Sequence, residues 1–128
     1  AWSGSGHKGD IQITNSYSKG SMPNNSYNGG FGGAVNANNL ISNSYALVNY
    51  PGHCAFGSTY SNPAAAVNSF YDSDICSSGS GGTGFTGKST ELMTTESTFT
   101  DAGWDFENVW GINPSINNGY PHLLWEEN

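Results

Sequence analysis

The sequence contains no arginine, and its only strong cations are Lys8, Lys19 and Lys88, against 10 acidic residues in a chain of 128. The formal net charge is −7, so no basic stripe exists that could neutralise the phosphates of a nucleic acid. The same shortage of cations disfavours docking on an anionic membrane surface. We therefore expect any partner to be neutral (a glycan, a protein or a copy of the chain) or cationic.

Long apolar runs are missing as well. No stretch approaches the ~20 apolar residues that span a bilayer, so we expect no membrane insertion. Only 10% of residues are charged and 35% are hydrophobic, which alone would suggest disorder. Four Trp, seven Tyr and six Phe argue against it. We therefore expect one folded domain over residues 1–128, with a thin core and many turns.

Cysteine is scarce. Cys54 and Cys76 form the only pair. In a chain whose composition is typical of a secreted protein, an even pair favours a disulfide between them. Two free buried thiols are the alternative.

What the sequence does contain is an internal repeat. The segment ITNSYS at 13–18 recurs as ISNSYA at 41–46 and, degraded, as VNSFYD at 67–72. Its anchors Asn15, Asn43 and Asn68 lie 28 and 25 residues apart. A second theme, GFGG at 30–33, returns as AFGS at 55–58, which places Phe31 and Phe56 25 residues apart. Periods of this length are typical of stacked repeats.

Gly, Asn, Ser and β-branched residues crowd these units, so they indicate short strands and tight turns in place of helices. We predict an all-β fold, a short right-handed parallel β-solenoid of about two to three coils over residues 11–76, after an N-terminal arm at 1–10. Stacking would align one column of side chains at Ile13, Ile41 and Val67, and another at Tyr17, Tyr45 and Tyr71. Each anchor asparagine would either hydrogen-bond along the stack or adopt a left-handed turn.

The character of the chain changes after about residue 76. Residues 77–84 form a Gly- and Ser-rich loop, and Ser89 or Thr90 can cap a single short helix over about 90–97, with Leu92, Met93 and Phe99 facing the core. An aromatic segment closes the chain. We expect it to form a terminal cap over the edge of the last coil, with a core of Trp104, Phe106, Trp110, Tyr120 and Trp125.

The segments GGFGG at 29–33 and LISNSYA at 40–46 resemble the GLUG repeat of bacterial surface proteins. That repeat follows the pattern Gly-Gly-Phe-x-Gly, spacer, Ile-x-Asn-Ser-Tyr-Ala, and it occurs in adhesin-like proteins and beside some secreted peptidase domains. The tail resembles the segment that often closes such arrays, through YDSD at 71–74, GGTG at 81–84, GWDFENVW at 103–110 and YPHLLW at 120–125. The resemblance implies a parallel β-solenoid, an extracellular location and no catalytic residues. The cysteine pair is not part of the common pattern.

Catalytic and metal chemistry find little support. The three histidines lie in separate parts of the chain, and no Gly-x-Ser-x-Gly elbow precedes a helix, so no catalytic residue or cofactor is assigned. Asp72 and Asp74 would share one face of a strand and are a weak calcium candidate, although solvated acids near a turn are the simpler reading. Asn24 begins an N-glycosylation pattern that also arises by chance.

These observations predict a non-enzymatic structural module of a bacterial surface adhesin or fibre, secreted or held at the cell surface. Its partners would be copies of itself, upstream repeats of the same protein, a glycan or a host surface protein. Nothing in residues 1–20 resembles a cap, so the exposed edge would continue into upstream repeats or join chains head-to-tail into filaments. The alternative is a carbohydrate-binding accessory module of a secreted enzyme.

Overall fold

A computed structural model describes residues 11–21, 32–35, 39–49, 56–59, 65–76 and 85–127. The predicted N-terminal arm at 1–10, Asn24, Phe31 and Cys54 lie outside the described residues.

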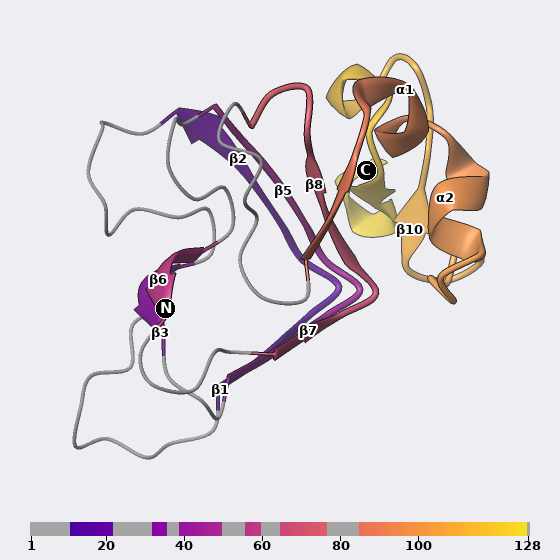
Figure 1. The fold of residues 1–128 in the computed structure, drawn as a ribbon. Coiled ribbons are helices and arrows are strands. Elements are labelled where there is room, and N and C mark those ends of the chain that lie inside the picture. Colours follow the sequence, from indigo (N-terminus) through magenta and orange to yellow (C-terminus); the bar gives the residue numbers. More distant parts are fainter. Residues whose placement is uncertain are drawn as a thin grey trace.

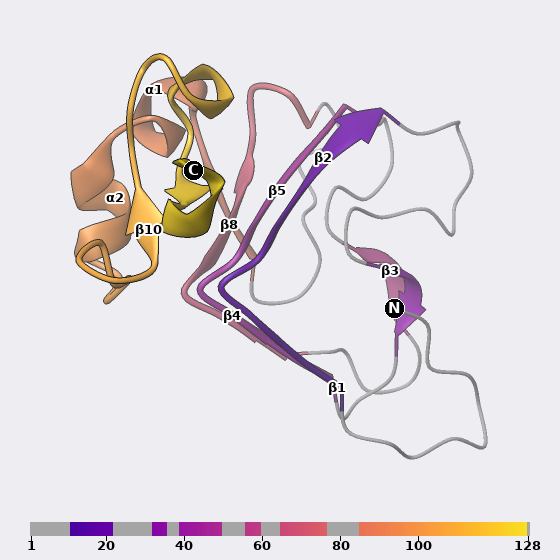
Figure 2. The same ribbon diagram turned by 180° about the vertical axis from the view of Figure 1, so that it is seen from behind.

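Three strand–corner–strand units form the first half of the fold. Each unit contributes one strand to a sheet of order β1-β4-β7 and the next strand to a sheet of order β2-β5-β8-β9, and all pairings in both sheets are parallel. The units appear in Figures 1 and 2 as three nested V shapes. Their strands are β1 (Ile11–Thr14) and β2 (Tyr17–Ser21), β4 (Asn39–Ser42) and β5 (Tyr45–Asn49), and β7 (Ala65–Val67) and β8 (Ser69–Asp72), with β9 (Phe85–Lys88) pairing onto β8. A separate parallel pair joins β3 (Gly32–Val35) to β6 (Phe56–Thr59).

Asparagine makes each corner. Asn15, Asn43 and Asn68 have φ angles of 50°, 49° and 49°, in the left-handed region that asparagine tolerates better than most residues. Of the two roles considered for these anchors, the left-handed turn is therefore the one that the structure shows. The sharp change of direction between the two strands of each unit follows from it.

The serine after each corner asparagine forms a hydrogen-bond ladder along the stack. Ser16 donates its amide to the Oγ of Ser44 at 3.2 Å, and Ser44 donates its amide to the Oγ of Ser69 at 3.2 Å. Each hydroxyl also donates to the carbonyl two residues earlier, as Ser44 does to Ser42 at 2.8 Å. The repeated serine thus satisfies polar groups at buried corners.

The register of the third unit differs from the prediction. Ile41 pairs with Ala66, and Tyr45 pairs with Phe70, so neither Val67 nor Tyr71 continues the predicted columns. Only one residue separates Ala66 from the corner asparagine, as in the first two units, whereas Val67 is its direct neighbour. A shift of one residue moves a side chain to the opposite face, and Val67 is accordingly 48% exposed.

In the second theme, Phe56 pairs with Gly32 of β3, and Phe31 lies outside the described residues.

The prediction of an all-β, right-handed parallel β-solenoid is wrong. Within the described segments the strands form separate sheets, three parallel and one antiparallel, which do not close into a continuous solenoid. Helices and an antiparallel pair follow, so the fold is mixed. The physical reason is that, apart from β9, which pairs onto β8, the C-terminal region does not extend the stack of strands. It lies against one face of the β2-β5-β8 sheet and buries aromatic residues there (Figures 1 and 2).

The C-terminal region holds several short elements. These are α1 (Thr90–Met93), α2 (Glu96–Thr100), β10 (Trp110–Gly111), the 3-10 helix η1 (Asn117–Gly119), β11 (His122–Leu123) and the 3-10 helix η2 (Leu124–Glu127). β10 and β11 pair antiparallel.

The single helix predicted over about residues 90–97 is two helices. Ser89 caps α1 by accepting the Leu92 amide at 3.3 Å, as expected. The break follows at Thr94 and Thr95, whose hydroxyls donate to carbonyls one turn earlier and compete with continued helix. Met93 and Phe99 are fully buried, whereas Leu92, expected to face the core, is 45% exposed.

Two hydrophobic clusters hold the fold. One lies within the angle of the V-shaped units and contains Ile41, Ala46, Ala66, Tyr71, Cys76 and Phe85. The other lies between the β2-β5-β8 sheet and the C-terminal region and contains Tyr45, Leu47, Phe70, Met93, Phe99, Trp104, Trp110 and Tyr120. Because successive side chains of a strand point to opposite faces of the sheet, the consecutive residues Phe70 and Tyr71 belong to different clusters.

Candidate functional site

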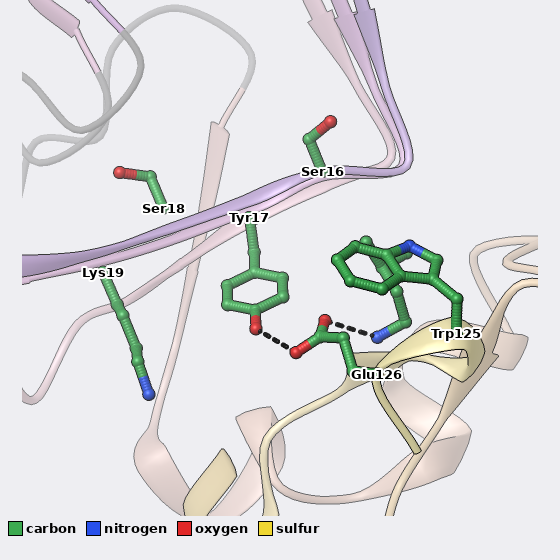
Figure 3. A pocket seen from close by; sticks show the side chains of 7 residues that line it. Ser16, Tyr17, Ser18, Lys19, Trp125 and Glu126 are labelled. Carbon is green, nitrogen blue, oxygen red and sulfur yellow. Dashed lines mark hydrogen bonds between the residues drawn. The ribbon is translucent and has the colours of Figure 1, made fainter. Parts of the chain in front are cut away.

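An open pocket of about 520 Å³ lies where the first unit meets the C-terminal segment. A volume of this size is in the range of ligand pockets, ~300–1,000 Å³. Figure 3 shows its walls: Tyr17 and Lys19 point to one side of the strand, where Tyr17 reaches Glu126, and Ser16 and Ser18 point to the opposite side. Its lining residues are Ser16, Tyr17, Ser18, Lys19, Leu123, Trp125 and Glu126.

Tyr17 is the central residue of the pocket. Its ring stacks on the ring of Tyr45 with centroids 5.1 Å apart and planes 5° apart, as strand pairing of Tyr17 with Tyr45 dictates. Its hydroxyl donates to Oε2 of Glu126 at 2.7 Å. Burial, and then this hydrogen bond to a carboxylate, raises the pKa of Tyr17 to about 12. The phenol is therefore neutral across the physiological range.

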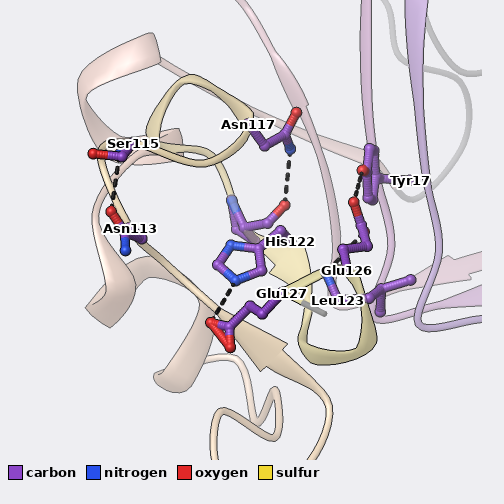
Figure 4. Close-up of polar contacts among 9 residues, drawn as sticks. Tyr17, Asn113, Ser115, Asn117, His122, Leu123, Glu126 and Glu127 are labelled. Carbon is purple, nitrogen blue, oxygen red and sulfur yellow. Dashed lines mark hydrogen bonds and ion pairs between the residues drawn. The ribbon is translucent and has the colours of Figure 1, made fainter.

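One further contact orders the C-terminal segment internally, and another ties it to β2. The other oxygen of the Glu126 carboxylate accepts the amide of Leu123 at 3.0 Å, which fixes η2 at the pocket wall (Figure 4). Lys19 donates from Nζ to Oδ1 of Asn117 at 2.8 Å. These hydrogen bonds set the positions of the Glu126 carboxylate and the Lys19 ammonium group at the pocket.

Trp125 lies at the rim of the pocket, and its side chain is 71% exposed. The expectation that it lies in the cap core is wrong. The other predicted cap residues behave differently: Trp104, Trp110 and Tyr120 are buried, and Phe106 is half-buried. An exposed indole beside a half-buried phenol can stack on a flat ligand.

Trp104 closes the last corner of the stack. Its Nε1 donates to the carbonyl of Asn68 at 2.8 Å. On the same side, β9 continues the sheet beyond β8. The second strand and the corner of the third unit thus contact later parts of the chain, whereas β7 is an end strand in the described part of its sheet.

Asp72, half of the calcium candidate, is a buried structural residue. Its Oδ1 accepts the amides of Asp74 and Ile75 at 2.8 and 3.2 Å, and its Oδ2 accepts the hydroxyls of Thr90 and Tyr120 at 2.8 and 2.6 Å. Oδ2 of Asp74 accepts the amide of Thr90 at 2.8 Å. The two carboxylates therefore join the end of β8 to α1 and to the aromatic segment. In the part of the chain that the structure describes, no three His, Cys, Asp or Glu side chains are grouped to hold a metal.

Two other polar positions complete the survey. His122 is fully buried and lies 3.0 Å from Oε1 of Glu127 through Nε2 (Figure 4). Cys76 is buried and disulfide-bonded, while Cys54, the other cysteine of the chain, lies outside the described residues, so their pairing stays a prediction.

Comparison with known proteins yields a partial match. The chain is 35% identical over 120 residues to a protein of Evansella cellulosilytica named as a Gly-rich membrane protein; the match covers 86% of this chain and 13% of that protein. The chain thus corresponds to a small part of its relative. No protein-family model matches the chain, so the GLUG resemblance stays a prediction, and no solved structure matches it. Among the helices described, none is long and apolar enough to span a membrane.

Proposed function

We propose that the chain is a non-enzymatic structural module of a bacterial extracellular surface protein, of the adhesin or fibre kind, that joins a neighbouring unit through the edge formed by β1 and β2. The observation that carries this proposal is the difference between the two ends of the stack. At one end, β9 pairs onto β8 and Trp104 donates to the carbonyl of Asn68, although β7 and β9 are themselves end strands in the described parts of their sheets. At the other end, no described strand pairs with the outer side of β1 or β2.

Backbone direction supports the edge as a joining surface. Tyr45 donates its amide to the carbonyl of Ser16 at 3.1 Å, so Ser16 and, two residues on, Ser18 face β5. In a parallel pair the direction alternates, so the amides and carbonyls of Tyr17 and Lys19 point away from β5. Strand groups that no described strand pairs with are where another strand can add.

Sedimentation velocity and negative-stain electron microscopy over rising concentration test the proposal. We expect end-to-end association that Lys19→Pro abolishes, because proline lacks the amide that faces the edge but leaves the bonds to β5 intact. The matched control is Lys19→Ala, which removes the same side chain but keeps the amide that faces the edge, so it should still join. Monodisperse monomers at high concentration would contradict joining between separate chains.

A carbohydrate-binding accessory module is the second candidate, and the exposed indole of Trp125 beside Tyr17 favours it. A glycan array with the intact chain and with Trp125→Ala discriminates the two functions. Binding that Trp125→Ala removes supports the second candidate, and an array without hits eliminates it.

A further inference from the structure

The pocket at Tyr17 lies at the end of a column of aromatic side chains, as far as the described residues extend. Phe70, Tyr45 and Tyr17 occupy equivalent positions in the three units, because Tyr45 pairs with Phe70 and Tyr17 pairs with Tyr45. The 5.1 Å between the rings of Tyr17 and Tyr45 is close to the ~4.8 Å between paired strands. A strand that pairs with β2 would therefore bring its own side chain over the ring of Tyr17.

The C-terminal segment forms hydrogen bonds with the hydroxyls of two successive tyrosines in this column. The hydroxyl of Tyr45 donates to the carbonyl of Pro121 and accepts Nδ2 of Asn117 at 2.9 Å. The hydroxyl of Tyr17 donates to Glu126 at the next level. Trp125 then stands at the rim with its indole exposed, so the wall extends beyond the last ring of the column (Figure 3).

The corner has an equivalent free position. The Oγ of Ser44 and the Oγ of Ser69 each accept the amide of the serine in the preceding unit. Ser16 donates its hydroxyl to Thr14 as the other two serines donate to theirs, so its Oγ is oriented to accept one more amide. A further unit with serine after its corner asparagine would supply that amide.

From these three features we infer that the pocket is a socket for the aromatic side chain of a further Asn-Ser-Tyr corner unit, carried ahead of β1–β2 in the same polypeptide. The inference rests on the proposed function, because it requires that the β1–β2 edge accept a unit. The three existing units belong to one polypeptide and recur after 28 and 25 residues, and the chain matches only 13% of the length of its relative. A unit on the same polypeptide is therefore the occupant that these observations favour. A sugar ring is the competing occupant, because it would use the same aromatic faces.

A tandem chain tests the inference. A second copy of residues 11–38 is inserted before residue 11, which reproduces the 28-residue spacing between the first two units. Trp2→Phe is introduced so that emission reports Trp104, Trp110 and Trp125. We expect one cooperative unfolding transition, lower acrylamide quenching than in the single chain, and a blue-shifted emission, because the added ring and strand cover Trp125.

The matched variants change only the inserted copy. Tyr17→Ser there should restore the quenching of the single chain and lower the Tm of the tandem chain by roughly 5 °C or more. Tyr17→Phe there should keep the protection, because Phe70 occupies the same place in the third unit.

The outcomes separate the two proposals. If the inserted copy unfolds independently or is removed by limited proteolysis, the edge does not accept a unit and the proposed function fails with the inference. The tandem chain could unfold cooperatively while Tyr17→Ser in the inserted copy leaves quenching and Tm unchanged. That result would support joining at the β1–β2 edge and refute the aromatic socket. Saturable quenching of Trp125 by mono- or disaccharides in the single chain, with no protection in the tandem chain, would also overturn the inference in favour of a sugar site.

Discussion

Replacing Asp72 by alanine should destabilise the fold strongly, because this side chain joins three parts of the structure. It is 1% exposed, and its oxygens accept the amides of Asp74 and Ile75 and the hydroxyls of Thr90 and Tyr120. Hydrogen bonds to a charged group contribute ~1.5–3 kcal/mol each, but they are not additive. The two amides lie in a turn where water can replace the carboxylate, so most of the loss comes from the hydroxyls.

We therefore expect Asp72→Ala to lower the free energy of unfolding by about 3 kcal/mol, which corresponds to a fall in Tm of roughly 10 °C. Denaturant unfolding followed by tryptophan fluorescence measures this. Asp101→Ala, at an exposed acid at the end of α2, is the matched control and should change stability by less than ~0.5 kcal/mol. In a double-mutant cycle, Tyr120→Phe should couple to Asp72→Ala by at least ~1 kcal/mol. A loss below ~1 kcal/mol for Asp72→Ala, or full additivity, would refute the role given to this carboxylate.

Three further predictions concern the ladder, the pocket and the last corner. Ser44→Ala should lower stability by about 1–2 kcal/mol in urea unfolding, because it leaves the partly buried amide of Ser16 without its acceptor, whereas the exposed Ser97→Ala should be neutral. Ultraviolet titration should find Tyr17 neutral at pH 11, since burial and its carboxylate partner raise its pKa from 10.0 to about 12. Tyr17→Phe should remove one phenol that titrates at high pH. The stability that this group contributes should be complete below pH 10 and should be lost as the pH rises through about 12. Trp104→Phe should cost about 1–3 kcal/mol through its lost indole hydrogen bond, while Trp125→Ala, at an exposed side chain, should leave Tm nearly unchanged in calorimetry.

The positions of the corner turns could be predicted from the sequence, whereas the strand register of the third unit and the placement of the C-terminal region could not. Asn15, Asn43 and Asn68 mark the turns because few residues other than asparagine and glycine adopt a left-handed conformation at low cost. The repeat did not reveal the third register, since Val67 imitates an apolar anchor while Ala66 occupies the position. It also did not reveal that the fold is mixed, because the placement of the C-terminal region depends on aromatic packing across the sheet face.

The pocket could not be predicted from sequence for a related reason. Tyr17 and Glu126 are 109 residues apart, and no period or motif links them. Trp125 belongs to an aromatic segment whose other tryptophans are buried, so residue type alone favoured the core. Its exposure is set by the direction in which η2 leaves β11, which only the assembled structure specifies.

The central claim is that β2 presents an open edge to a neighbouring unit, and amide hydrogen exchange at Tyr17 and Lys19 tests it most directly. In the dilute single chain these amides should exchange at least tenfold faster than that of Tyr45, which donates to the carbonyl of Ser16. In the associated or tandem chain they should become as protected as Tyr45. Protection of Tyr17 and Lys19 already in the dilute monomer would mean that another part of the chain occupies the edge, and it would contradict the account.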